Sequence, residues 1–248
     1  GTAHDKLWNS EYGQKQKTER DHIYFGTVLE HILLQNLCAF YDVGEHNEMR
    51  LHGADWNDAL DMAWEKGESV AFTCAYAGNL RNIAKTLRQL EEISGSSKIE
   101  IAHEMEDLLA GSVELYEDAA RKQALLAGYA KKCEHNISGD TIVVRLDQLA
   151  ANLEGKADWM MKNIRANEWV KDGEDGWFNG YYDNHGRKVE GVMDESVRMM
   201  LTGQVFAIMS GTATEDQVES ICRSADKYLY DQKAGGYRCL LYSSPSPR

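Results

Sequence analysis

Apolar side chains recur at intervals of three and four residues along most of the chain, which is the spacing of one face of an α-helix. This pattern predicts helices over residues 22–42, 68–93, 99–133, 144–165, 194–210 and 215–230. The third helix is expected to break near Gly111. The last helix begins after Thr214, with Gln217 three residues further on, which is the signature of a capping box.

One segment departs from the helical pattern. The stretch "KDGEDGWFNGYYDNHGRKVEG", residues 171–191 and called the aromatic segment below, is rich in glycine, asparagine, aspartate and aromatic residues. That composition predicts a loop or hairpin insertion. Little else resembles a strand, so we expect an all-α fold. The pattern is compatible with a bundle, a solenoid and an (α/α) toroid. Acidic and aromatic residues concentrate in the connecting segments, which is the arrangement expected of a toroidal enzyme.

Composition and charge narrow the functional classes. The 248 residues carry a net charge of −13, which argues against nucleic acid or an anionic membrane as the main partner. No apolar run reaches the roughly 18 residues of a membrane-spanning helix. The cysteines form no C-x-x-C pair and the histidines show no metal-binding spacing, so we expect no metal, reduced thiols and a cytoplasmic location. Signatures of serine hydrolases and nucleotide-binding proteins are also missing from the sequence.

The last ten residues differ in composition from the rest of the chain. Both prolines of the protein, Pro245 and Pro247, fall within "CLLYSSPSPR", residues 239–248. We interpret this tail as non-native sequence and assign residues 1–238 to the domain. A genuine disordered terminus rich in serine and proline is the alternative.

The stretch "GADWND" places two aspartates and an asparagine around a tryptophan, shortly before a predicted helix. One aspartate there would most simply cap the helix, because its carboxylate accepts hydrogen bonds from free backbone N–H groups. Asp55, Asn57 and Asp58 together exceed what one cap requires. Trp56 offers a platform for a sugar ring, and a carboxyl group desolvated beside an indole gains the raised pKa of a general acid.

The aromatic segment is the second candidate for chemistry. Its aromatic rings alternate with amide and carboxylate groups, a mixture that suits carbohydrate, with Trp177 and Tyr181 as candidate binding residues. The alternative is a hairpin whose aromatic rings fill the core. Gln204, within a later apolar helix, is expected either to belong to the core or to hydrogen-bond a loop or a ligand.

These segments occur together in a known family. "GADWNDALD" followed by "GESVAFTCAYAGNL" resembles the acid-bearing motif of glycoside hydrolase family 94, the inverting disaccharide and oligoglucan phosphorylases, whose pattern is close to G-G-D-W-N-D-G-M. The upstream helix, the aromatic segment and "GQVFAIMSGTAT" follow in the family's order, so the resemblance spans residues 22–238. It implies part of an (α/α)6 barrel (toroid) catalytic domain, with inorganic phosphate as co-substrate and no cofactor.

The resemblance also implies roles for individual residues. Asp58, the aspartate of W-N-D, corresponds to the general acid that protonates the glycosidic oxygen while phosphate attacks the anomeric carbon from the opposite face. Trp56, Asp55 and Asn57 would belong to the substrate site. The reaction would convert a β-linked glucan oligosaccharide or disaccharide to α-glucose 1-phosphate.

The chain departs from the family pattern at three places. Ala59-Leu60 replaces Gly-Met, Asn179-Gly180 replaces an arginine pair, and the I-D-S-I-A-Q run reads "MMLTGQ", without its aspartate. With these differences the chain looks more like 1,2-β-oligoglucan phosphorylases and the phosphorylase-like domain of cyclic β-1,2-glucan synthases. The family's phosphate-binding segment has no counterpart, so we expect the chain to be a fragment and inactive alone. The full-length protein could form a homodimer.

Two other functions fit the same residues. An inverting hydrolase on an (α/α) barrel would need a second carboxylate about 6.5–9.5 Å from Asp58 to activate water. Asp183 and Glu195 are the candidates for that base. A non-catalytic helical domain that binds carbohydrate or serves as a scaffold would use the aspartates of "GADWND" only as caps.

Overall fold

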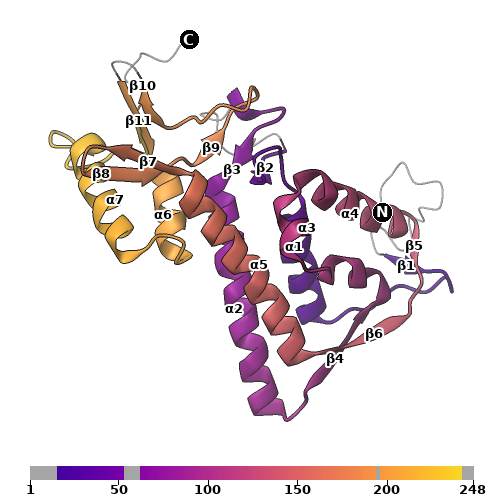
Figure 1. Cartoon of the computed structure of the whole chain (residues 1–248). Helices are drawn as coiled ribbons and strands as arrows, with labels where there is room; N and C mark the ends of the chain where they lie inside the picture. The colour runs from indigo at the N-terminus through magenta and orange to yellow at the C-terminus, as the bar shows by residue number, and fades with distance from the viewer. Residues whose placement is uncertain (1–15, 53–61, 194–195, 242–248) are drawn as a thin grey trace. The chain divides into compact units, whose positions relative to one another are not determined.

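The computed structural model describes residues 16–52, 62–193 and 196–241. Contacts divide the chain into two compact units: unit 1 comprises residues 1–42 and 81–155, and unit 2 comprises residues 43–80 and 156–248. Two long helices, α2 (Val70–Ser94) and α5 (Leu146–Asn167), contribute residues to both units (Figure 1).

Unit 1 is mainly helical. Besides parts of α2 and α5, its described elements are β1 (Lys17–Thr18), α1 (Val28–Tyr41), β4 (Lys98–Ala102), the 3-10 helix η2 (His103–Leu109), α3 (Val113–Glu117), α4 (Ala119–Lys132), β5 (Asn136–Ile137) and β6 (Thr141–Arg145). The helix α4 packs against α1 and η2, and β4 pairs with β6 (Figure 1). The ring of Phe40 lies in this core, edge-on to Tyr41 and Tyr116 at centroid distances of 4.9 and 5.1 Å.

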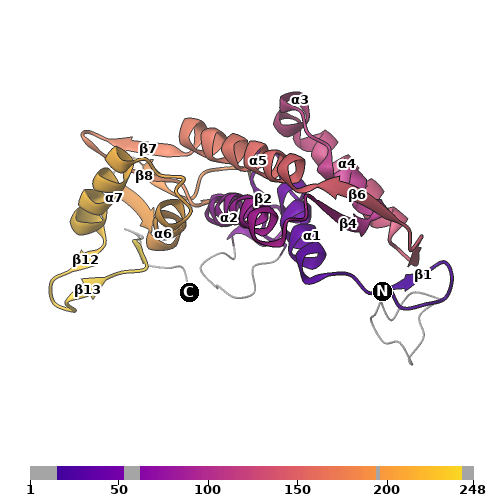
Figure 2. The same cartoon turned by 90° about the horizontal axis from the view of Figure 1, so that it is seen from below.

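Unit 2 combines helices with short strands. Its further described elements are β2 (Met49–Arg50), β3 (Glu68–Ser69), β7 (Trp169–Asp172), β8 (Asp175–Phe178), β9 (Tyr181–Tyr182), β10 (Gly191–Met193), β11 (Ser196–Met200), α6 (Leu201–Met209), α7 (Glu215–Tyr228), β12 (Tyr230–Asp231), β13 (Gly236–Tyr237) and β14 (Leu240–Leu241). The hairpin β7–β8 turns at Gly173, where φ is +64°. Helices α6 and α7 lie side by side against this hairpin (Figures 1 and 2).

Several predicted features are confirmed. The predicted helix over 68–93 is α2, and the predicted helix over 215–230 is α7, which opens with a capping box between Thr214 and Gln217. The break expected near Gly111 separates η2 from α3. The hydroxyl group of Tyr41 donates to the carbonyl oxygens of Leu108 and Ala110 there, so the broken backbone keeps hydrogen-bond partners.

The expectation of little strand is wrong. Helices dominate, but the described residues also form six small sheets of two or three strands. Residues 99–102 were expected to begin a helix and instead belong to β4, because Ile99 and Ile101 alternate and pair with the β-branched stretch of β6. Likewise, residues 196–200 form β11 between β10 and β14, so the helix expected from 194 begins at Leu201.

The proposed tail is only partly within the described residues. The backbone N–H of Leu201 donates to the carbonyl oxygen of Cys239 at 2.7 Å, and β14 pairs with β11. Residues 242–248 lie outside the described ranges. The non-native origin of residues 239–248 and the (α/α)6 barrel both stay predictions.

Candidate functional site

A three-stranded sheet in unit 2 joins the described strands on either side of residues 53–61 to the aromatic segment. Strand β2 pairs with β3, and β3 pairs with β9, both antiparallel. The acid-bearing segment, residues 53–61 with Asp55, Trp56, Asn57 and Asp58, lies in the connection between β2 and β3. Strand β9 belongs to the aromatic segment. The described flanks of the acid-bearing segment are therefore hydrogen-bonded, through β3, to the aromatic segment.

The connection between β2 and β3 is closed by backbone hydrogen bonds at its base. The N–H of Leu51 donates to the carbonyl oxygen of Gly67 at 3.0 Å, and the N–H of Gly67 donates to that of Ala63 at 2.9 Å. A Cβ atom at Gly67 would lie 2.2 Å from the Ala63 oxygen, so only glycine fits. Just before the segment, His52 adopts a left-handed conformation with φ of +49°.

Glu68 is a buried carboxylate at the centre of this sheet. Its side chain accepts hydrogen bonds from the backbone N–H of His46 and of Glu48, and its Oε1 lies 2.8 Å from the His46 Nδ1. The imidazole of His46 stacks on the ring of Tyr182, with centroids 3.7 Å apart. These contacts connect three segments around one carboxylate: the chain before β2, strand β3 and strand β9. They also provide the buried carboxylate with hydrogen-bond partners.

The close approach of Gly44 to Glu68 leads to a stability prediction. A Cβ atom at Gly44 would lie 2.2 Å from Cδ of Glu68. We expect Gly44→Ala to lower the free energy of unfolding by about 1–3 kcal/mol, because the fixed carboxylate must shift. Urea denaturation measures the change. Gly128→Ala, in the middle of α4 with nothing near its added Cβ, is the control and should stabilise by up to about 1 kcal/mol. Equal effects at both positions would contradict the prediction.

Glu168, at the start of the β7–β8 hairpin, is a second buried carboxylate. The hydroxyl group of Tyr182 donates to its Oε1 at 2.7 Å, and the side-chain amide of Asn179 donates to its Oε2 at 3.0 Å. The ammonium group of Lys188 lies 3.4 Å from the same Oε2. Three side chains of the aromatic segment are thus fixed by one carboxylate, which accounts for polar residues among its aromatic rings.

Glu190, at the end of the aromatic segment, is a third buried carboxylate. It accepts from the backbone N–H of Gly180 and of Met200, each at 2.8 Å. Burial raises the pKa of Glu190 to about 8, against the lowering effect of these N–H donors. Met200 stands where the family run I-D-S-I-A-Q has its aspartate, so here a carboxylate from the residue before β10 contacts the backbone of that position.

Gln204 on α6 completes this network. Its side chain exchanges two hydrogen bonds with the backbone of Phe178, at 2.8 and 2.7 Å, and is buried. Of the expected roles, the structure supports a core residue, and the backbone that Gln204 binds is that of strand β8.

Only some of the site residues predicted from sequence lie within the described ranges. Trp177 and Tyr181 are fully buried, Trp177 against Tyr228 at a centroid distance of 5.6 Å. This burial is what the packing alternative predicted, and their role in substrate binding stays a prediction. Residues 55–58 and Glu195 lie outside the described residues.

Asp183, one candidate base for a hydrolase, is already engaged. Its Oδ1 accepts from the N–H groups of His185 and Arg187, and its Oδ2 accepts from the Arg187 guanidinium at 2.8 Å. Burial alone would raise the pKa of Asp183, but these hydrogen bonds outweigh it and lower the pKa. The carboxylate is therefore a weak base and a turn-forming group.

Sequence reasoning missed the buried carboxylates Glu68, Glu168 and Glu190. The available signal was a charged residue beside glycine, tryptophan or valine, next to segments otherwise assigned to the core. That signal is common on surfaces too, so only the contacts distinguish these residues.

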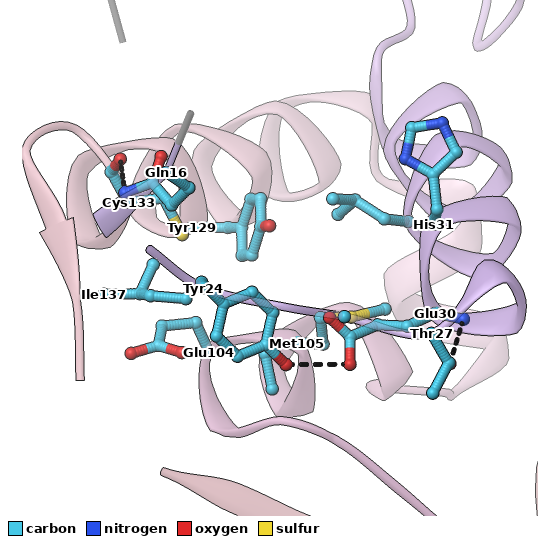
Figure 3. A pocket seen from close by; sticks show the side chains of 13 residues that line it. Gln16, Tyr24, Thr27, Glu30, His31, Glu104, Met105, Tyr129, Cys133 and Ile137 are labelled. Atoms are coloured by element: carbon cyan, nitrogen blue, oxygen red, sulfur yellow. Dashed lines mark hydrogen bonds between the residues drawn. The ribbon is translucent and has the colours of Figure 1, made fainter. Parts of the chain in front are cut away.

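A cavity of about 320 Å³ lies within unit 1, separate from the residues above (Figure 3). Its walls include the carboxylates of Glu30 and Glu104 and the rings of Tyr24 and Tyr129. The hydroxyl group of Tyr24 donates to Glu30 at 2.9 Å, and the N–H of Ser138 donates to Glu104 at 2.7 Å. The described residues that line the cavity include these two carboxylates and no lysine or arginine, a lining that does not favour an anion such as phosphate.

The part of the chain that the structure describes contains no group of three His, Cys, Asp or Glu side chains placed to hold a metal ion. Within the same ranges, no helix combines the length and the apolar character needed to cross a membrane.

Comparison with known proteins found one family and one relative that are similar to this chain. Residues 144–245 match the family described as "Glycosyl hydrolase 94 superfamily, catalytic domain". A solabiose phosphorylase of Paenibacillus borealis is 25% identical over 206 residues, which are 82% of this chain and 19% of that protein. The chain thus spans about a fifth of the length of this relative. Over residues 144–245 the chain is therefore similar to the catalytic domain of glycoside hydrolase family 94.

Proposed function

We propose that the chain is part of a glycoside phosphorylase that cleaves a β-linked glucan or disaccharide with inorganic phosphate. Asp58 is the general acid that protonates the leaving oxygen, and the product is α-glucose 1-phosphate, formed by inversion. The observation that carries this proposal is the sheet β2–β3–β9, which joins the flanks of the "GADWND" segment to the aromatic segment. From the similar solabiose phosphorylase we take only the reaction type, phosphorolysis.

The contacts around α2 support a chemical role for the aspartates. The alternative was that Asp55 or Asp58 caps the following helix. Helix α2 begins at Val70, and the side-chain oxygen of Ser69 accepts from the N–H of Phe72 at 3.0 Å, as an N-cap residue does. Neither aspartate is needed for that cap.

The state of Asp183 favours a phosphorylase over a hydrolase. An inverting hydrolase requires a carboxylate free to deprotonate water, whereas phosphate is itself a nucleophile and needs no such base. Both oxygens of Asp183 accept hydrogen bonds from the turn that follows, including two from Arg187. Glu195 remains the other candidate base for the hydrolase.

Phosphate dependence tests the proposal. The full-length protein, meaning the complete product of the reading frame that encodes this chain, should release glucose 1-phosphate from a β-glucan or disaccharide panel only when phosphate is present. Proton NMR of the first product should detect the α-anomer. Release of free glucose at the same rate with and without phosphate would identify a hydrolase instead.

A further inference from the structure

Asn184 holds the backbone that follows the acid-bearing segment. Its side-chain Oδ1 accepts from the N–H of Glu65 at 2.8 Å and from the N–H of Lys66 at 2.9 Å. Its own N–H donates to the carbonyl oxygen of Met62 at 2.8 Å. One asparagine therefore binds three backbone groups of residues 62–66, directly after the segment that carries Asp58.

The turn that carries Asn184 is itself fixed. Asp183 accepts from the N–H groups of His185 and Arg187, and it donates its own N–H to the Arg187 carbonyl oxygen at 2.9 Å. On the other side, Tyr182 in β9 donates its hydroxyl group to the buried Glu168. Asn184 thus extends from a hydrogen-bonded turn next to a strand, which is a firm support for a positioning group.

Within the stretch held by Asn184, Ala63 is buried and Met62 packs against the core, whereas the three residues that follow have little packing. Trp64, Glu65 and Lys66 are all exposed, and Trp64 is 52% accessible. The path of residues 64–66 is therefore determined by hydrogen bonds more than by apolar burial. The two bonds to the Asn184 oxygen fix consecutive N–H groups, which restricts the direction of the backbone as well as its distance from β9.

We propose that Asn184 is a positioning residue for the general acid, acting through the backbone of residues 62–66. The inference rests on the proposed function, because it assigns Asn184 to the placement of Asp58. A general acid works only when it reaches the leaving oxygen within hydrogen-bond distance, and a shift of about 1 Å can cost about 100-fold in rate. Asn184 touches neither substrate nor phosphate in this role.

Amide hydrogen exchange in this chain tests the structural half of the proposal. In the unchanged protein the N–H groups of Glu65 and Lys66 should be protected. Asn184→Ala should remove protection at these two amides, whereas Asn184→Asp should keep it, because a carboxylate oxygen can accept both bonds. Asn82→Ala, at an exposed position of α2, is the control and should leave both amides protected. Unchanged protection in Asn184→Ala would overturn the proposal.

Leaving-group dependence in the full-length protein tests the functional half. A disaccharide needs protonation of a poor leaving group, whereas β-glucosyl fluoride releases fluoride without a proton. Asn184→Ala should lower kcat for the disaccharide roughly 10- to 100-fold, change kcat for the fluoride by less than about threefold, and be rescued by Asn184→Asp. A purely structural role would lower both rates equally, and that result, or a failure of Asn184→Asp to rescue, would overturn the inference.

The variant Asp58→Asn separates this inference from the function on which it rests. If Asp58 is the acid, Asp58→Asn shows the same selective loss on the disaccharide. A loss that is equal on both substrates in Asp58→Asn contradicts the proposed function. A selective loss in Asp58→Asn but not in Asn184→Ala contradicts only the positioning role.

Discussion

Replacing Asp58 by asparagine is expected to reduce phosphorolysis of a disaccharide by about 10²–10⁴-fold in the full-length protein, which is the usual contribution of a positioned general acid. Asparagine keeps the size of the side chain but cannot deliver a proton to the leaving oxygen. The substrate KM should change little, because the loss concerns the transition state. Initial rates of glucose 1-phosphate formation, measured over a range of disaccharide concentrations, give both parameters.

Folding must be shown to survive this substitution. The thermal midpoint of Asp58→Asn should stay close to that of the unchanged protein. Asp61→Asn, three residues further along and without an assigned role, is the matched control and should retain its rate. If Asp58→Asn lowered the midpoint and left the rate unchanged, the aspartate would be a structural cap and not an acid.

Replacing Glu190 by glutamine is expected to remove a pH dependence of stability between about pH 5 and pH 8. Burial raises the pKa of this carboxyl from 4.5 to about 8 in the folded chain. Between these values the folded state holds a proton that the unfolded state has released, so rising pH favours unfolding. The contribution of Glu190 to stability is complete below the lower pKa and is lost as pH rises through the higher one, by roughly 1.4 kcal/mol per pH unit.

The difference between the unchanged chain and Glu190→Gln isolates this group. Urea denaturation at several pH values should give a difference in unfolding free energy that shifts by roughly 4 kcal/mol between pH 5 and pH 8 in favour of the glutamine variant. The same substitution at Glu219, an exposed residue of α7, is the matched control. A difference that is constant with pH at position 190 would show that its carboxyl does not bind a proton in this range.

The helices with a wide apolar face and clear ends could be predicted from sequence. Helix α7 shows why: its capping box, Thr214 and Gln217, specifies the start through contacts within four residues. Local signals of this kind need no knowledge of the rest of the fold. The same holds for the hairpin β7–β8, whose turn glycine is Gly173.

The short strands could not be predicted, because their partners are distant in sequence. Strand β4 becomes a strand only by pairing with β6, some forty residues later. Strand β3 consists of Glu68 and Ser69 and takes its conformation from β2 on one side and β9 on the other. Two residues carry no detectable alternation, so no periodicity analysis could identify them.

For the candidate site, the sequence indicated the acid-bearing motif and the family it resembles, but not the hydrogen bonds that hold the surrounding backbone. The residues "GADWND" and their flanks indicated an acid-bearing segment, and comparison with known proteins found similarity to the same family. The clamp by Asn184 and the network of Glu68, Glu168 and Glu190 gave no such signal. Each depends on backbone N–H groups or tyrosines that lie far away along the chain.

The sequence by itself therefore determined the predominance of helices, the ends of those with local caps, the order of the acid-bearing and aromatic segments, and the resemblance to family 94. Only the tertiary structure decided that β9 joins β3, that three carboxylates are buried among N–H donors, and that Asn184 holds residues 62–66. The physical reason is the range of the interactions. Helix periodicity and capping act within a few residues, whereas burial of a charge and pairing of a two-residue strand exist only once distant segments have met.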